Sequence, residues 1–246
     1  MTHSRRTQLA AEKDRNVDVI VCTFESRDVH VVRNIFAASM GEMRGPLIRD
    51  VMYQAVLYGC PLSLPVTLMT ILCSWFLVFY LILLFAILLA LFAALHIGFS
   101  RYIKSCLNTD LSDVQSTYLR QKMSHMLVAE ISGHVVGMVA LAPDNDHNES
   151  FGKPREPVGR LRRMAVSPEF RRLGVTNKLL DKLLNYTKEV GYTDVVLLTT
   201  SAQEAALKFY PKHGFQLVSK RLANRALRGF YHFVYCYNLK KLQKVA

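Results

Sequence analysis

The sequence predicts an α/β fold that is interrupted by a helical membrane-anchoring insert. Residues 161–184 (LRRMAVSPEFRRLGVTNKLLDKLL) have the pattern of a strand, a short basic loop and an amphipathic helix. Short segments rich in β-branched residues before and after them predict further strands. Residues 51–100 contain no Asp, Glu, Lys or Arg, which is typical of chain that enters a lipid bilayer. Together these patterns place a membrane insert inside a folded domain.

The folded domain is expected to begin after a flexible tail of residues 1–15, which is polar and has no signal-peptide pattern. Residues 17–24 (VDVIVCTF) read as a strand because β-branched residues dominate them. Residues 28–40 read as a helix because apolar residues recur there at helical spacing. We therefore assign residues 16–45 to a first strand and helix.

The insert is assigned to residues 46–104. Its most apolar part, residues 75–95, is long enough to cross a hydrocarbon core of roughly 30 Å at about 1.5 Å per helical residue. If residues 17–24 belong to the same sheet as the later strands, both ends of the insert lie on one side of the membrane. That requires a helical hairpin or a re-entrant segment rather than a single crossing. The expected break carries Gly59, Pro61, Ser63 and Pro65.

Basic residues flank the insert at both ends. Arg44 and Arg49 precede it, and Arg101 and Lys104 follow it. Because Lys and Arg favour the cytoplasmic side of a membrane, both flanks predict a cytosolic folded domain.

The main part of the domain is assigned to residues 105–246. Residues 111–123 are expected to form a helix capped by Asp110 or Ser112. Residues 126–131 and 135–141 alternate around Ser132, Gly133 and His134, which predicts a β-hairpin. A polar loop is expected at residues 143–158, and further strands at residues 194–198, 215–221 and 231–239.

The loop at residues 171–176 is a candidate anion site. It contains Gly174 and leads into a helix whose first N–H groups have no partner within the helix. Gly174 has no Cβ, so a ligand oxygen can approach its backbone closely. Arg171 and Arg172 add positive charge beside it, and the sequence therefore predicts a phosphate site.

Two motifs resemble the GNAT family of acetyl-CoA-dependent N-acetyltransferases. In the phosphate loop, Arg171 and Gly174 match the motif, whereas Thr176 stands where Gly or Ala is usual. Residues 205–215 resemble the Ala-x-x-x-Tyr-x-x-x-Gly-Phe signature through Tyr210 and Gly214. Residues 109–113 and 135–139 extend the resemblance to the camello type of membrane-bound N-acetyltransferase, so that it covers residues 16–239.

The resemblance implies a mixed sheet with helices on both faces, with acetyl-CoA as co-substrate. Met164 and Val166 would lie against the pantetheine arm, and an N–H near Ala165 or Val166 would stabilise charge on the thioester oxygen. The loop would hold the pyrophosphate. The full set of implied cofactor-binding residues is Met164, Ala165, Val166, Arg171, Arg172, Leu173, Gly174, Val175, Thr176 and Gln203.

Tyr210 matches the tyrosine that many GNAT enzymes use as general acid for the departing thiolate, although it could also only pack on the cofactor. Pro211 departs from the usual residue and could end the helix early. The family's usual Glu base is replaced by Arg160. The alternatives for the base are His125, Glu130 and His147, or a water-mediated route. Arg160, Arg162 and Arg163 are candidates for binding a substrate carboxylate, and we assign Arg160 and Arg162 to that role.

The resemblance therefore predicts a membrane-anchored N-acetyltransferase that acetylates a primary amine of an amino acid, an amino-acid conjugate or a protein lysine. The alternative is a catalytically weak membrane protein that acts through acetyl-CoA or partner binding. The resemblance also predicts an endoplasmic reticulum or Golgi membrane, and it leaves a lumenal domain possible. The sequence does not predict an oligomeric state.

Composition limits the other partners. The net charge of +12 suits a bilayer surface and an acidic ligand, and no nucleic-acid-binding module is recognisable. The five cysteines include no CxxC pair, so neither a metal site nor a disulfide framework is expected.

Overall fold

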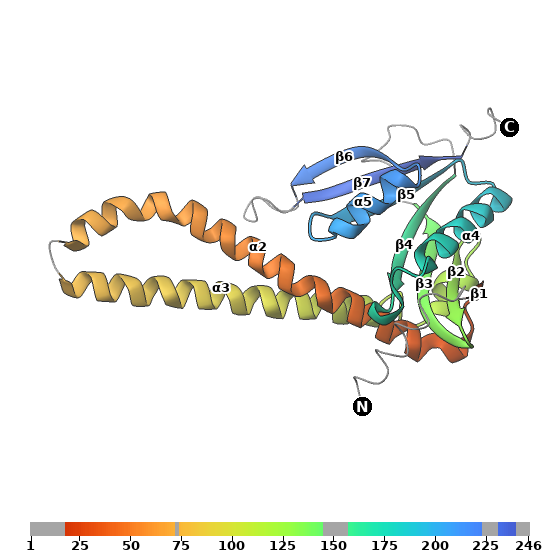
Figure 1. Cartoon of the computed structure of the whole chain (residues 1–246), viewed down its shortest axis with the longest axis horizontal. Coiled ribbons are helices and arrows are strands. Elements are labelled where there is room, and N and C mark those ends of the chain that lie inside the picture. The colour runs from red at the N-terminus through yellow and green to blue at the C-terminus, as the bar shows by residue number, and fades with distance from the viewer. Residues whose placement is uncertain (1–17, 72–73, 145–156, 223–230, 240–246) are drawn as a thin grey trace.

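The computed structural model describes residues 18–71, 74–144, 157–222 and 231–239. Within them a seven-stranded mixed sheet has helices on both faces, and two long helices project from one end of it (Figure 1). The predicted fold class is thereby confirmed. The expected tail at residues 1–15 and most of the polar loop at residues 143–158 lie outside the described residues.

The strands follow the spatial order β1-β2-β3-β4-β5-β7-β6. Neighbouring strands are antiparallel except β4 and β5, which are parallel. The strands are β1 (Val19–Thr23), β2 (His125–Ile131), β3 (His134–Pro143), β4 (Val158–Val166), β5 (Asp194–Thr200), β6 (Gln216–Leu222) and β7 (Tyr231–Asn238). The helices and short helical turns are η1 (Ser26–Asp28), α2 (Val29–Ile71), α3 (Ser74–Asn108), η2 (Gln115–Leu119), η4 (Pro168–Phe170), α4 (Val175–Val190) and α5 (Glu204–Lys212).

Helix α4 covers one face of the sheet, as its sequence pattern predicts. Its inward side chains are Leu179, Leu180, Leu183, Leu184 and Thr187, all of them buried. They pack on buried residues of the sheet, and burial of each leucine is worth about 1.5–3 kcal/mol. The helix ends at Gly191, whose positive φ of 90° closes the last turn.

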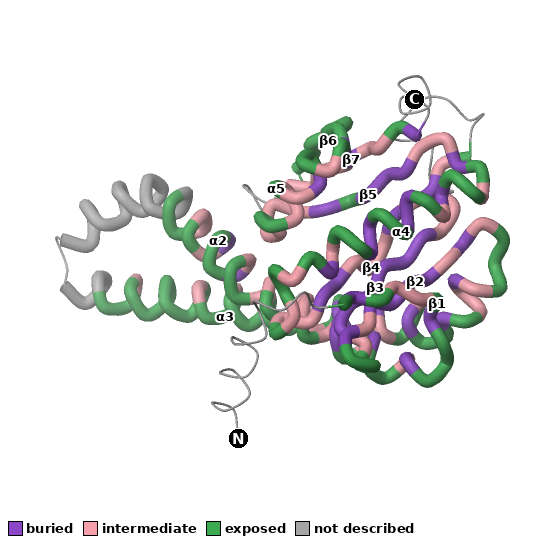
Figure 2. The backbone as a smooth tube through the Cα atoms, turned by 45° about the vertical axis from the view of Figure 1, so that its right-hand side comes forward, coloured by how far each residue is buried: buried purple, intermediate pink, exposed green. Residues whose placement is uncertain are grey.

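The opposite face is covered by the first turns of α2 and by the segment around η2. Phe36 and Val32 from α2 pack with Leu111, Val114 and Tyr118 against the sheet. The buried backbone is purple on both sides of the sheet in Figure 2, whereas the described part of the projecting helices is mostly green. The two cores hold the sheet between them.

Helices α2 and α3 form an antiparallel helical hairpin, which is one of the two arrangements expected for the insert (Figure 1). Within the described residues, Val78–Asn108 is long and apolar enough to cross a membrane, and no residue of its most apolar window is buried. Near the sheet the two helices are tied by a hydrogen bond between Arg44 and His96, 3.1 Å long. Arg33 also donates to the carbonyl groups of Leu107 and Leu111.

Three expectations about helix limits are wrong. The first helix does not end at residue 40, because α2 continues through the presumed domain boundary at 45/46 and through the expected break at residues 59–65 to Ile71. The helix expected at residues 111–123 is only the short π-helical turn η2. Neither of its two expected caps, Asp110 and Ser112, caps it with a side-chain hydrogen bond. Asp110 is an ion-pair partner of Arg163, and it is Asp113 that accepts the N–H of Ser116.

The boundaries at residues 15/16, 45/46 and 104/105 stay a proposal for how the chain is organised. Elsewhere in the chain, helix α4 begins at Val175, inside the loop expected at residues 171–176.

We predict that Gly137→Ala destabilises the protein by about 1–3 kcal/mol, because the site is already closely packed. A Cβ at Gly137 would lie 3.1 Å from atoms of both Leu179 and Val175 at the start of α4. The measurement is thermal unfolding of the detergent-solubilised protein. The matched control is Gly41→Ala in α2, where a Cβ meets nothing within 4 Å. That change should stabilise the helix by up to about 1 kcal/mol, so equal losses in both variants would contradict the packing argument.

Candidate functional site

The sheet opens between its two parallel strands. β4 and β5 are paired only from Val158 and Asp194 to Leu161 and Leu197. Beyond that point β4 stays paired with β3, and β5 stays paired with β7. Residues 162–166 of β4 therefore present their free edge to a gap in the middle of the sheet, where backbone groups are available to a ligand.

A β-bulge accompanies this opening. Met138 of β3 pairs with Ala165 and Ala140 with Arg162, so two residues of β4 lie opposite Val139. One of them, Arg163, has a φ of 55°, a conformation that non-glycine residues adopt only when their surroundings hold them there. A bulge turns the strand locally and leaves backbone groups unpaired.

The side chain of Arg163 fixes this bulge through its contacts with Asp110 and Phe36. It makes two hydrogen bonds of 2.7 Å with Asp110, and its guanidinium group lies 4.9 Å from the centre of the Phe36 ring. The hydroxyl of Tyr118 donates to the same carboxylate. Burial alone would raise the pKa of Asp110, but the hydrogen bonds from Arg163 and Tyr118 outweigh it and lower that pKa.

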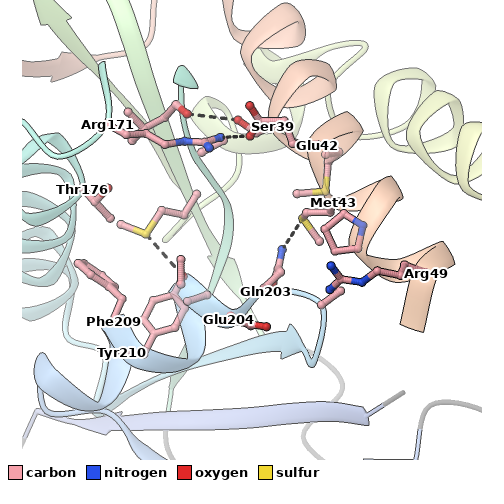
Figure 3. A pocket seen from close by; sticks show the side chains of 18 residues that line it. Ser39, Glu42, Met43, Arg49, Arg171, Thr176, Gln203, Glu204, Phe209 and Tyr210 are labelled. Carbon is pink, nitrogen blue, oxygen red and sulfur yellow. Dashed lines mark hydrogen bonds and ion pairs between the residues drawn. The ribbon is translucent and has the colours of Figure 1, made fainter. Parts of the chain in front are cut away.

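A cavity of about 550 Å³ lies in the gap of the sheet. Figure 3 shows Ser39, Glu42, Met43 and Arg49 of α2 on one side of it and Thr176, Phe209 and Tyr210 on the other. The lining residues come from four places in the chain: α2, the end of β4, the loop before α4 with the first turn of that helix, and α5 with the residues before it.

The cavity brings together seven of the residues that the sequence singled out. They are Met164, Ala165, Val166, Arg171, Thr176, Gln203 and Tyr210. Arg172, Leu173, Gly174 and Val175 do not line it: Val175 is buried, and Arg172 and Gly174 are exposed, both with positive φ. Gly174 precedes the first turn of α4 and supplies no capping side chain, so the free N–H groups of that turn and Arg171 favour an anion there.

Three contacts across the cavity connect α2 with the opposite wall (Figure 3). Glu42 forms an ion pair of 2.6 Å with Arg171, and Ser39 donates a hydrogen bond to the carbonyl group of Val166. Gln203 accepts a hydrogen bond from Thr199 and contacts the sulfur of Met43 at 3.3 Å. These contacts hold α2 over the gap in the sheet.

Tyr210 is 7 % exposed and its hydroxyl contacts the sulfur of Met164 at 3.5 Å. Its ring packs between Phe209 and Phe215, with ring centres 5.5 and 5.4 Å away. Burial raises the pKa of Tyr210, so the phenol keeps its proton through neutral and moderately alkaline pH. Pro211 does not end the helix at once, since α5 continues to Lys212.

Other sequence candidates lie away from the cavity. Arg160 forms an ion pair of 2.5 Å with Asp144, so its charge is already matched by a carboxylate of the chain. Arg162 does not line the cavity. Of the base candidates, His125 stacks on Tyr186 with ring centres 4.3 Å apart, and neither it nor Glu130 lines the cavity. His147 lies outside the described residues.

The α2 wall was missed by the sequence analysis. Ser39, Met43, Pro46 and Arg49 line the cavity at intervals of three and four residues, which is the period of one helix face. Gly41, Gly45 and Pro46 are poor helix formers, and they obscured the continuation of the helix. The helical spacing of residues 28–40, if followed beyond residue 40, could have indicated that the helix continues.

The arrangement suits the transfer of a group carried by an elongated anionic ligand. The helix end and Arg171 can bind phosphate, the free edge of β4 can bind the arm that follows, and a protonated phenol stands at the inner end. Two carboxylates, Glu42 and Glu204, also line the cavity, and Glu42 is held by Arg171.

The chain is similar in sequence to known acetyltransferases. A sequence model of the Acetyltransferase (GNAT) family matches residues 92–215. N-acetyltransferase 8 of Rattus norvegicus is 30% identical over 197 residues, which is 78% of this chain and 84% of that protein. N-acetyltransferase family 8 member 3 of the same species is 32% identical over 196 residues, covering 78% and 82%.

One solved structure gives a matching fold over most of the chain. An acetyltransferase of the GNAT family from Staphylococcus aureus Mu50 aligns with 90% of this chain and 99% of its own at a TM-score of 0.53. Its sequence identity is 15%, so the likeness concerns the fold.

We predict that Arg171→Ala weakens acetyl-CoA binding about tenfold or more, since a charge-assisted hydrogen bond is worth about 1.5–3 kcal/mol. Isothermal titration calorimetry with acetyl-CoA measures it. The matched control is Arg172→Ala, because the neighbouring arginine does not line the cavity. Its dissociation constant should change by less than about twofold. Equal losses in the two variants would mean that general positive charge, rather than a positioned contact, binds the ligand.

We predict that Asp110→Asn lowers the free energy of unfolding by about 2–4 kcal/mol at neutral pH, because it leaves the guanidinium of Arg163 without its charge partner. Because folding lowers the pKa of Asp110, its stabilisation is complete above the ordinary carboxyl pKa of about 4. It is lost as the pH falls through the lower, folded pKa. Thermal unfolding across this pH range should show the two proteins converging in acid.

The control for this measurement is Asp18→Asn, which removes an exposed ion pair with Lys178 and should cost less than about 1 kcal/mol. A difference between wild type and Asp110→Asn that stays constant down to the lowest pH would refute the role of the charged carboxylate.

Proposed function

Because the chain belongs to the GNAT family of acetyltransferases, and is an acetyl-CoA-dependent N-acetyltransferase, we propose that it acetylates a primary amine at the cavity between β4 and α5. The proposed acceptors are an amino acid, an amino-acid conjugate or a protein lysine. The observation that supports this proposal is the cavity itself, which is lined by Thr176 in the first turn of α4, by the free edge of β4 and by the buried phenol of Tyr210.

In the proposed binding mode, the diphosphate of acetyl-CoA contacts Arg171 and the first N–H groups of α4. The pantetheine arm follows the free edge of β4 past Val166 and Met164. Thr176 and Gln203 line the same cavity, and Thr176 can offer its hydroxyl where a smaller residue would offer only space. Arg172, Leu173, Gly174 and Val175 would contribute through their backbone, which sets the position of the first turn of α4.

In the proposed reaction, the neutral amine nitrogen attacks the thioester carbonyl carbon. An N–H of the bulged segment near Ala165 stabilises the charge that develops on the carbonyl oxygen. The C–S bond then breaks, the amide is released, and Tyr210 gives its proton to the departing thiolate. The proton that the amine nitrogen loses returns through solvent to the Tyr210 phenolate, so the products are an N-acetyl amide and the free thiol of coenzyme A.

We further propose that the α2–α3 hairpin anchors the enzyme in a membrane. The apolar helix Val78–Asn108 supports this proposal, since no residue of its most apolar window is buried. Because the two helices are antiparallel, Arg44 and Arg101 lie at the same end of the hairpin, next to the sheet. That charge distribution favours a cytosolic catalytic domain, and an endoplasmic reticulum or Golgi membrane remains the expected location.

The function is tested by incubating the detergent-solubilised protein with acetyl-CoA and a panel of primary amines and measuring the release of free thiol. Amine-dependent thiol release supports the proposed function. Binding of acetyl-CoA without thiol release from any amine would favour the alternative of a catalytically weak binding protein.

We predict that Tyr210→Phe lowers kcat by about 10²–10⁴-fold, the usual contribution of a positioned general acid. Its dissociation constant for acetyl-CoA should stay within about twofold, because the ring packing is kept. Since burial raises the pKa of Tyr210 above its ordinary value of about 10, the wild-type kcat should not fall through this group below that pH.

The matched control is Tyr192→Phe, which removes another buried tyrosine hydroxyl that donates to the carbonyl group of Met123, 2.8 Å away. It should cost about 1 kcal/mol of stability and leave kcat unchanged. A Tyr210→Phe enzyme with full kcat would restrict Tyr210 to packing.

A further inference from the structure

The face of α2 that lines the cavity is opposite to the face whose side chains are buried in the protein. Ser39, Met43, Pro46 and Arg49 line the cavity, whereas Ile48 and Val51 lie on the other side of the helix, each 7 % exposed. The helix therefore has one side packed into the molecule and one side that forms a wall of the cavity.

The cavity face does not stop at Arg49. Tyr53 follows Pro46 by seven residues, or two helical turns, and Leu57 follows Met43 by fourteen, or four turns. Tyr53, Val56 and Leu57 are 65 %, 54 % and 50 % exposed. We call these three residues the α2 stripe. The wall of the cavity thus continues as an exposed apolar surface on the same helix.

The order of residues along this face is that of a membrane interface. Arg49, paired with Asp50 at 3.3 Å, stands at the cavity. A tyrosine follows one turn later, and apolar side chains follow the tyrosine. Charged side chains and then tyrosine are typical of the headgroup level, and apolar side chains are typical of the hydrocarbon region. With the hairpin in a bilayer, the cavity opens at the headgroup level and the stripe enters the lipid.

We propose that the acceptor is an amphiphilic primary amine, whose amino group enters the cavity while its apolar tail lies along the α2 stripe in the bilayer. The inference rests on the proposed function and on the hairpin as membrane anchor. The lining near Arg49 accepts such a molecule, since Met40, Met43 and Pro46 provide an apolar passage between the stripe and the reacting centre. The chemical step is the acetyl transfer given above, with the thiol of coenzyme A as leaving group.

The test uses the full chain in phospholipid nanodiscs with saturating acetyl-CoA and three probes: butylamine, octylamine and dodecylamine. Thiol release gives kcat/KM for each. The measured quantity is the ratio of dodecylamine to butylamine, which removes any general loss of activity. In the wild type we expect a ratio of about tenfold or more, because the longer amine removes more methylene groups from water.

A long amine also concentrates in any bilayer, so two variants separate the stripe from simple partitioning. The double variant Tyr53→Ser/Leu57→Ser removes the stripe. Its control is Leu83→Ser/Ile87→Ser on α3, whose targets are 48 % and 56 % exposed. Arg44 and His96 are hydrogen-bonded partners in antiparallel helices. Along its own helix, Ile87 is as far from His96 as Tyr53 is from Arg44. Leu83 is likewise as far from His96 as Leu57 is from Arg44. The two control positions therefore lie at the same depth along the hairpin as the two stripe positions.

The proposal requires that the stripe variant lose most of the chain-length ratio and that the control keep it. Equal ratios in the wild type, the stripe variant and the control would overturn the amphiphilic acceptor, and so would an equal loss in both variants. Acetyl-CoA titration of each variant shows that the domain is folded. Absence of thiol release with every amine in the wild type would instead defeat the proposed function, so the two failures are distinguishable.

Discussion

The pairing of β1 with β2 is the constraint on which the architecture depends. Val19 pairs with Ile131 and Thr23 with Leu127, and the backbone N–H of Phe24 continues the ladder to Met126. The whole α2–α3 hairpin lies between these two strands in the chain. Because the strands are hydrogen-bonded along their full length, the chain must return to the side from which it left. An apolar insert between two such strands can only be a helical hairpin or a re-entrant segment, and the antiparallel helices α2 and α3 form a hairpin.

The same constraint places the proposed anchor beside the chemistry. α2 leaves β1 through η1 and packs Phe36 and Val32 on the sheet before it leaves the domain. α3 returns to the sheet and is followed by Asp110, which holds Arg163 and so the bulge at the free edge of β4. The proposed membrane anchor is therefore connected to both walls of the cavity, through α2 directly and through Asp110 indirectly. In the proposed enzyme the acceptor site and the membrane-facing surface are consecutive parts of one helix.

The gap between β4 and β5 explains how a continuous sheet can offer free backbone groups to the proposed elongated cofactor. The two strands separate after Leu161 and Leu197, and each keeps its other neighbour, so the opening leaves most of the hydrogen-bond ladder intact. Arg163 adopts a positive φ there, an unfavourable backbone conformation that the ion pair with Asp110 and the contact with Phe36 offset. Gly137 lets α4 lie close to β3, and the N-terminal turn of α4 thereby reaches the cavity.

The sequence by itself determined the elements whose pattern is local. The β2–β3 hairpin, the amphipathic α4 and the strands β1, β4, β5, β6 and β7 all follow from spacing and turn residues within short segments. The loop before α4 and the segment of Tyr210 were also recognisable, because each motif is contiguous in the chain. The tertiary structure decided what depends on distant partners. Asp110 was expected to cap a helix, but its partner Arg163 lies 53 residues away in the chain. Arg160 was expected to bind substrate, and only the fold shows that its guanidinium group is paired with Asp144. The extent of α2 as a cavity wall was equally hidden, since its glycines and Pro46 disfavour a helix locally and packing against the sheet and α3 outweighs that preference.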